Sequence, residues 1–474
     1  MNFLKELIEA YKVSRSPLFD PAFYSMMHGG RSLPTYNFIH KGWKRGYLPN
    51  SWISKERWAE LCAKSKECPL LNPTLCKELL NEYVKEQQPK PSSRFFRDVT
   101  PQLKVVPNGY CIPGKNAIEG FNWVKNIASG WQIVSIHDAQ GKAVPESGGG
   151  LFDSKEISAL TQEEMDACEV SDEDVYYLGP YVTQWGHVLC DLLLTRLWCA
   201  LDGEVAKEKF ILVQLANQPP SFMKNVEGLL SLLGILPEQL QIITRPTRFR
   251  TLYVPEVSAV GGQWWSQAYK RTCDALRDAV PPAEVKKVFF GRNAFDWASS
   301  KERGEEKLQE LFKKAGYRVF TPESLTVAQE IALVKGCSSF VALSGTIPHN
   351  LVFAKEGTEA IILQKFEHES SHQNLINEMR TLNVYNLSAF FGFLPVEIGI
   401  GPFLLGITPE VKAFALARGW RMVCRGKLTR NDLIWYIKTF VKLNRDALKE
   451  SWFDVPEIKQ NLKNMLRIRL GLEE

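Results

Sequence analysis

An arginine and a glycine-containing turn give this chain the means to bind an anionic group. Arg292 ends one apolar run, and Ser344, Gly345 and Thr346 end another, so both sets are predicted to follow strands. Pro348 suits the first turn of a helix, because its missing N–H would have no partner there. A helix N-terminus and a guanidinium at neighbouring strand ends would together favour a phosphate or diphosphate.

The positive charge near this turn can be assigned in more than one way. Arg292 could instead form a surface ion pair with Asp296 or Glu302.

Three further polar residues follow predicted strand ends. His349 would lie in the first helical turn, where the helix dipole disfavours the imidazolium and leaves a neutral hydrogen-bonding group; a packing role is the alternative. Asn350 could bridge loops through its amide. Glu323 could bind ligand hydroxyls, whereas a capping box with Thr326 fully explains Gln329.

His187 and Asp191 are four residues apart in a predicted helix, and this spacing stacks them on one face. A carboxylate in that position can orient an imidazole as a general base. The alternative is a buried histidine–aspartate hydrogen bond that only stabilises the fold.

No pattern in the sequence predicts a metal site or the nucleotide loop of another enzyme class. The ten cysteines form no Cys-x-x-Cys pair, and there is no strand-end Asp-x-Asp, P-loop or Gly-x-Gly-x-x-Gly fingerprint. The acidic run at 171–174 is interpreted as a solvated loop. We therefore expect no metal and no cofactor, with basic and dipolar groups stabilising negative charge instead.

Alternating strands and helices must position these groups. From 286 to 364 the pattern alternates strand and helix, which requires crossover connections and therefore a parallel sheet. A second α/β layer is predicted from a helix at 220–235 and from strands at 209–216, 240–245 and 251–256. The predicted fold class is α/β with two Rossmann-like lobes, and ligands are expected at the carboxyl ends of the strands.

Shifts in composition divide the chain into four parts. Residues 1–90 are predicted to form a small helical, aromatic-rich module, 91–260 a first lobe, 261–400 a second lobe, and 401–474 a basic helical tail. From residue 418 onward there are thirteen Lys and Arg against seven Asp and Glu. The tail could lie on an anionic membrane surface, or it could be the solvated face of helices packed on the core.

Several separated motifs resemble one enzyme family. They are GHVLCD (186–191), FFGRN (289–293) and a long block at 317–363. In the long block the family's positions are occupied by Pro322, Glu323, Thr326, Gln329, Ser344, Gly345, His349, Asn350, Phe353 and Ala354. This order is similar to that of glycosyltransferase family 61, and of its bacterial branch in particular. The resemblance runs roughly from Tyr176 to Leu387.

The resemblance implies a GT-B type fold, with two Rossmann-like lobes facing a cleft. The first lobe would take the acceptor and the second a nucleotide-sugar donor. Many eukaryotic members have His-Gly-Ala-Gly where this chain has 344–347, which leaves His349 as the one imidazole expected near the turn. Donor binding would involve Arg292, Arg303, Ser344, Gly345, Thr346, His349 and Asn350, and catalysis His187, Asp191 and Glu323. Arg303 is a secondary candidate because the family has an arginine near this position, and Lys301 is the competing assignment.

The implied activity is an inverting, metal-independent transfer of a sugar from a nucleotide diphosphate to a hydroxyl group. The acceptor would be a surface polysaccharide such as capsule, or a lipid-linked glycan, and no nucleic acid is expected as a partner. The alternative is a non-catalytic GT-B-like protein that binds glycan or acts as a scaffold in polysaccharide assembly. The segment 16–50 is similar to a small module attached to bacterial polysaccharide-building enzymes.

Composition gives an expectation about location. The chain is 45% hydrophobic, yet its first residues lack the apolar core of a signal peptide and no apolar run reaches the length of about 18 residues that spans a bilayer. Scattered single cysteines suit a reducing compartment. We expect a cytoplasmic protein, peripheral on the inner membrane face if the basic tail binds lipid.

Overall fold

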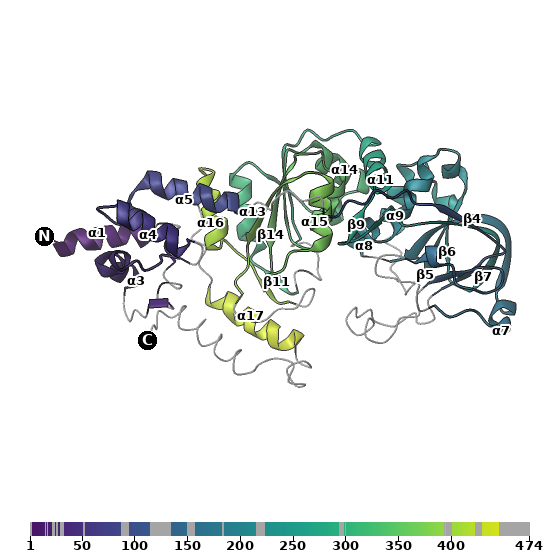
Figure 1. The fold of residues 1–474 in the computed structure, drawn as a ribbon, viewed down its shortest axis with the longest axis horizontal. Coiled ribbons are helices and arrows are strands. Elements are labelled where there is room, and N and C mark those ends of the chain that lie inside the picture. Colours follow the sequence, from purple (N-terminus) through teal and green to yellow (C-terminus); the bar gives the residue numbers. More distant parts are fainter. Residues whose placement is uncertain are drawn as a thin grey trace.

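The structure is a computed structural model, and three parts lie in a row along its longest axis (Figure 1). A helical N-terminal part lies at one end, one α/β unit is in the middle and a second α/β unit is at the other end. The residues that the structure describes are 2–14, 16, 18–20, 24, 27–28, 33–50, 53–86, 94–113, 134–148, 157–182, 184–214, 223–292, 298, 300–392, 394, 401–421 and 429–444. None of the helices within those ranges combines the length and the apolar character needed to cross a membrane.

The middle unit contains a five-stranded sheet in which every pairing is parallel, as predicted. Its strand order is β12-β10-β13-β14-β15. The strands are β10 (Lys287–Phe290), β12 (Arg318–Phe320), β13 (Ser339–Leu343), β14 (Glu359–Gln364) and β15 (Asn383–Ser388). Because the chain goes from β10 to one neighbour, β12, and then returns to the other, β13, the strand order reverses at β10. Ligands of doubly wound sheets bind at the carboxyl side of such a reversal.

Helices connect these strands, as the sequence pattern predicts. They are α13 (Glu305–Lys314), α14 (Val327–Gly336), the short 3-10 helix η11 (Ile347–Phe353) and α15 (Ser371–Met379). Thr326 and Gln329 form the predicted capping box at the start of α14. α13 begins only at Glu305, because Glu302 and Arg303 form a short strand, β11, that pairs with β16 (Phe403–Leu404).

The end unit contains a seven-stranded mixed sheet, so the expectation of a regular Rossmann-like lobe is only partly met. Four strands run parallel: β4 (Glu169–Tyr181), β5 (Lys209–Gln214), β6 (Leu240–Ile243) and β7 (Thr247–Pro255). Three short strands join them in antiparallel pairs: β1 (Leu103–Pro107), β2 (Tyr110–Ile112) and β3 (Ser135–His137). β1 and β2 follow each other along β7, with β1 paired to residues 251–255 and β2 to residues 247–248.

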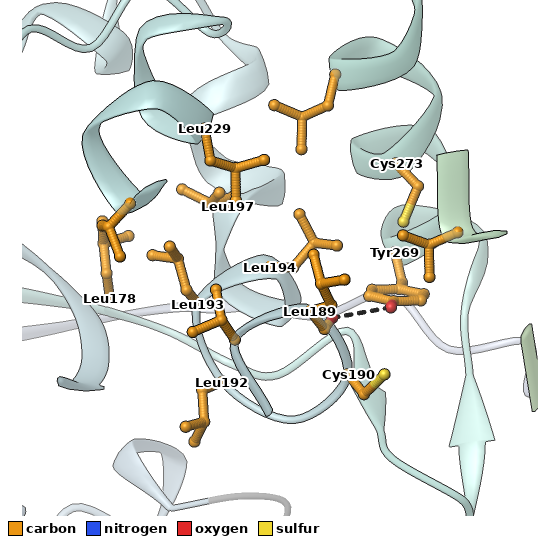
Figure 2. Close-up of a cluster of buried hydrophobic side chains, with 14 of the residues drawn as sticks. Leu178, Leu189, Cys190, Leu192, Leu193, Leu194, Leu197, Leu229, Tyr269 and Cys273 are labelled. Carbon is orange, nitrogen blue, oxygen red and sulfur yellow. Dashed lines mark hydrogen bonds between the residues drawn. The ribbon is translucent and has the colours of Figure 1, made fainter. Parts of the chain in front are cut away.

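A dense apolar cluster links α8 (Trp185–Cys190) and α9 (Leu193–Arg196), which follow β4, to α11 (Gln267–Asp278) (Figure 2). Leu189 and Cys190 are buried beside Tyr269 and Cys273 of α11. The Tyr269 hydroxyl donates to the Leu189 carbonyl at 2.9 Å. This packing fixes α8, whose polar residues belong to the site described below.

The N-terminal helices pack on the middle unit. Phe19, Tyr24, Phe38 and Trp58 are buried in one aromatic core. That core includes Ala413 of α16 (Pro409–Ala417), and α5 (Pro73–Glu86) packs against the same helix. Other helices among the described residues of the N-terminal part include α1 (Asn2–Ser14), α3 (Pro34–Asn37) and α4 (Lys55–Lys64).

The described part of the C-terminal segment also packs on the middle unit. α17 (Arg430–Leu443) buries Leu433, Tyr436 and Phe440 beside Leu404 of β16. Residues 445–474, on which much of the expectation of a membrane-binding tail depends, lie outside the described residues.

Candidate functional site

The carboxyl edge of the parallel sheet brings Arg292 and the predicted turn together. Arg292 follows β10, and Ser344 and Gly345 follow the neighbouring strand β13. Gly345 has φ 128°, a conformation that favours glycine, and a Cβ atom there would lie 3.1 Å from Arg292 Nη1. The guanidinium therefore lies directly against the turn, at the reversal of strand order.

Two lysines join Arg292 at this edge, and we call Arg292, Lys301 and Lys365 the cation cluster. The three side chains come from different segments, and the residues are only 8%, 5% and 6% exposed. Lys365 follows β14, donates from its backbone N–H to Ser344 Oγ at 3.1 Å and pairs through Nζ with Glu302 Oε1 at 2.8 Å. Arg292 Nη2 lies 3.5 Å from the same Glu302 oxygen. Arg292 is therefore buried, and the expectation of a surface ion pair with Glu302 was wrong about its exposure.

Positive charge exceeds negative charge in this buried cluster. Burial, together with Lys365 and Arg292, lowers the pKa of Lys301 to about 7, and burial beside Arg292 lowers the pKa of Lys365 to about 8. Burial raises the pKa of Glu305, which accepts the Arg292 backbone N–H at 3.0 Å, to about 7. Cations that are this poorly solvated favour an anionic ligand.

Two of the predicted site residues lie apart from the cation cluster. Arg303 donates through Nε to Asp432 of α17 at 2.8 Å and stacks over Trp435, so its charge is already paired. Glu323 lies in a 3-10 turn after the edge strand β12 and is exposed. The structure gives neither residue a contact with Arg292.

The predicted pair His187–Asp191 forms a short hydrogen bond. His187 Nδ1 lies 2.6 Å from Asp191 Oδ2, with His187 in α8 and Asp191 as the residue that ends the helix. Asp191 is only 2% exposed. Burial would raise the pKa of its carboxyl group, but hydrogen bonds from His187 and His372 outweigh burial and hold the pKa well below its usual value.

Two more histidines surround this pair, and we call His187, Asp191, His349 and His372 the imidazole cluster. His372 Nε2, in α15, lies 3.1 and 3.2 Å from the two carboxylate oxygens of Asp191. The His349 ring stacks on that of His372, with centroids 5.9 Å apart. The expectation that His349 is the one imidazole near the turn was therefore wrong, because α8 and α15 each bring another.

His349 is a neutral, buried imidazole. Burial and the nearby His372 lower its pKa to about 3, in line with the neutral group that was predicted. Among the described residues, neither of its ring nitrogens has a hydrogen-bond partner. Both nitrogens are also buried.

The start of η11 also connects the two α/β units. The Trp185 indole N–H donates to Asn350 Oδ1 at 2.9 Å, which gives Asn350 the bridging contact considered from the sequence. A Cβ atom on Gly186 would lie 2.9 Å from His349 Nδ1 and 3.2 Å from Thr346 Oγ1, so α8 touches the turn itself. The ends of β4 and β13 thus face each other.

His187, Asp191 and His372 also form a group that could hold a metal ion, because their ligand atoms all lie within 4.8 Å of one another. Two ligands of a tetrahedral zinc ion at ~2.0–2.1 Å lie roughly 3.3 Å apart, which is longer than the His187–Asp191 separation of 2.6 Å. The geometry therefore favours hydrogen bonds to a shared carboxylate.

A small polar pocket lies on the other side of Gly345, at the same sheet edge. It is lined by Ser344, Gly345, Pro348, Ile362, Gln364, Glu369, Ser370, Gln373, Asn374 and Asn386. Among the described residues, the Gln364 and Gln373 side-chain oxygens have no hydrogen-bond partner. The pocket places amide groups next to the cation cluster, where they could contact a polar ligand.

The described residues thus form two α/β units, with buried cations at the carboxyl edge of the parallel sheet and a histidine–carboxylate pair at the contact between the units. The family model described as Glycosyltransferase 61 matches residues 185–361, which include α8, both strand ends and η11. This match supports the assignment of the protein as a glycosyltransferase. A search of curated proteins found no match to the chain.

Proposed function

We propose that this protein is an inverting glycosyltransferase that takes a sugar from a nucleotide-diphosphate donor. The observation that carries the proposal is the buried cation cluster at the reversal of strand order. Bringing three cations together out of water is costly, and the Glu302 carboxylate is shared by two of them, Arg292 and Lys365. A diphosphate would neutralise them, and the Gly345 turn admits its oxygens close to the backbone.

The two sheets would be the lobes of a GT-B type fold, with the donor on the parallel sheet and the acceptor on the mixed sheet. His187 would take the proton of the acceptor hydroxyl as that oxygen attacks the anomeric carbon. The sugar–phosphate bond breaks in the same step, and its electrons go to the diphosphate oxygen beside the cation cluster. His349 would bind a hydroxyl group of the sugar through a ring nitrogen.

The acceptor that we propose is a hydroxyl of a surface polysaccharide, such as capsule, or of a lipid-linked glycan. The support is the resemblance of segment 16–50 to a module of polysaccharide-building enzymes, together with the packing of that part on the donor unit through α16. Such an enzyme would work in the cytoplasm, where nucleotide sugars are available, and at the membrane face where lipid-linked acceptors are presented.

A thermal-shift measurement with a panel of nucleoside diphosphates tests the donor site. One diphosphate should raise the melting temperature of the wild type, because a ligand at ~100 times its Kd adds about 2.7 kcal/mol to stability. Lys365→Met should abolish the shift. The control Lys287→Met removes a lysine at the amino end of β10, the opposite edge of the sheet, and should leave the shift intact. No shift with any nucleoside diphosphate would refute the proposal.

A further inference from the structure

His372 connects the two α/β units through the carboxylate of Asp191. It lies in the first turn of α15, on the parallel-sheet side, and is 181 residues from Asp191 in the chain. Its Nε2 approaches both oxygens of Asp191, at 3.1 and 3.2 Å, while His187 approaches one of them at 2.6 Å. One buried carboxylate therefore accepts hydrogen bonds from imidazoles on both sides of the interface.

The surroundings of this contact hold it in place. A Cβ atom on Gly261 would lie 2.0 Å from Asp191 Oδ1 and 2.5 Å from the His372 ring, so this position admits only glycine without displacing the pair. At the other end of α15, the Glu378 carboxylate accepts the backbone N–H groups of Phe95 and Phe96 at 2.9 and 3.0 Å. α15 is thus tied to the neighbouring unit at both ends.

We propose that His372 is a positioning residue for the base His187, an inference that rests on the proposed function. With Asp191 ionised, both facing nitrogens must donate, because a carboxylate only accepts. His372 Nε2–H then fixes the carboxylate, the carboxylate fixes the Nδ1–H tautomer of His187, and Nε2 of His187 is the basic nitrogen. His187, the proposed base on the mixed-sheet side, is therefore positioned by His372 from the parallel-sheet side.

Charge around Asp191 explains why a second donor matters. The titratable groups that face it are His187 and Cys190 from its own segment, His349 of η11, His372 of α15 and Tyr269 of α11. Burial raises the pKa of the carboxyl group, and the two hydrogen bonds from His187 and His372 lower it. Removing the bond from His372 should raise that pKa, so that Asp191 takes up a proton at a higher pH and no longer orients His187.

The test is the pH dependence of kcat in His372→Phe, which keeps a ring but loses the N–H. We expect kcat to fall on the order of 10-fold or more, the scale seen when the hydrogen-bond partner of a metal-binding histidine is removed. The acid limb of the pH profile of kcat should also move to higher pH. His372→Gln, which retains an N–H donor, should recover most of the rate. The control His368→Phe alters an exposed histidine three residues before α15 and should match the wild type.

The donor's dissociation constant and the melting temperature are measured on the same preparations. Unchanged donor affinity with a shifted acid limb supports the proposal, whereas a wild-type rate and acid limb per folded molecule in His372→Phe overturns it. If His372→Phe does not fold, the same rate, pH profile and donor affinity are measured on His372→Ala and judged by the same criteria. A wild-type protein that binds no nucleoside diphosphate and transfers no sugar would instead refute the proposed function.

Discussion

The cation cluster lies at the carboxyl edge of the parallel sheet and the imidazole cluster at the contact between the two α/β units, and their charges are balanced differently. In the cation cluster, Glu302 is shared by Arg292 and Lys365, and the pKa of both buried lysines is lowered. In the imidazole cluster, the single carboxylate of Asp191 accepts two hydrogen bonds and its pKa is held low. We propose that the first cluster binds the anionic ligand and that the second carries the proton transfer.

The largest expected effect is on the chemical step. His187→Gln should lower the single-turnover rate on the order of 100-fold or more, the usual scale for loss of a general base. Donor affinity should not change, because His187 lies outside the cation cluster. Rapid-quench kinetics measures the rate, and a less stable but fully active variant would show that the pair only supports the fold, at about 1–3 kcal/mol for the unsatisfied partner.

The second largest effect is expected on ligand binding by the cation cluster. Arg292→Gln should weaken binding of the nucleoside diphosphate roughly 10- to 150-fold, which corresponds to a charge-assisted hydrogen bond of about 1.5–3 kcal/mol. Arg303→Gln is the matched control, because Arg303 pairs with Asp432 and should barely affect affinity. Equal losses in the two variants would mean that general positive charge, and not the cluster, attracts the ligand.

The sequence predicted most of these positions from strand ends, a local signal. Arg292, Ser344 and Gly345 were found in that way, and the same rule applied to the strand that ends at Gln364 would have found Lys365. His372 carries no such signal, because it meets Asp191 through folding across 181 residues. Arg303 was assigned because the family that the chain resembles has an arginine near this position, and its partner Asp432 lies 129 residues away.

The two sheets also differ in how far local sequence patterns could predict them. Each strand of the parallel sheet is separated from the next by a helix or helical turn, so its pattern could be recognised from the sequence. β2 and β3 of the mixed sheet have three residues each, too few to show a period, and their antiparallel pairing depends on contacts with β7.

A smaller effect should follow from pH. With pKa values lowered to about 7 and about 8, Lys301 and Lys365 lose protons as the pH rises through that range, and a bound anion favours their protonated forms. Affinity for the nucleoside diphosphate should therefore fall about 10-fold for each unit by which binding raises a lysine pKa. Calorimetry between pH 6.5 and 9 in buffers of different ionisation enthalpy should show proton uptake on binding, and its absence would mean that both lysines stay charged.

No effect is expected from removing divalent metal ions. If hydrogen bonds hold the imidazole cluster together and cations stabilise the leaving diphosphate, turnover should be unchanged in excess chelator. Loss of activity in EDTA that manganese, magnesium or zinc restores would instead make His187, Asp191 and His372 metal ligands.

The division of labour between the clusters is tested most directly by calorimetric titration of the wild type, Arg292→Gln and His187→Gln with one nucleoside diphosphate. The account predicts that Arg292→Gln loses at least ~10-fold in affinity while His187→Gln binds like the wild type. Equal affinities in all three proteins, or a loss confined to His187→Gln, would contradict it.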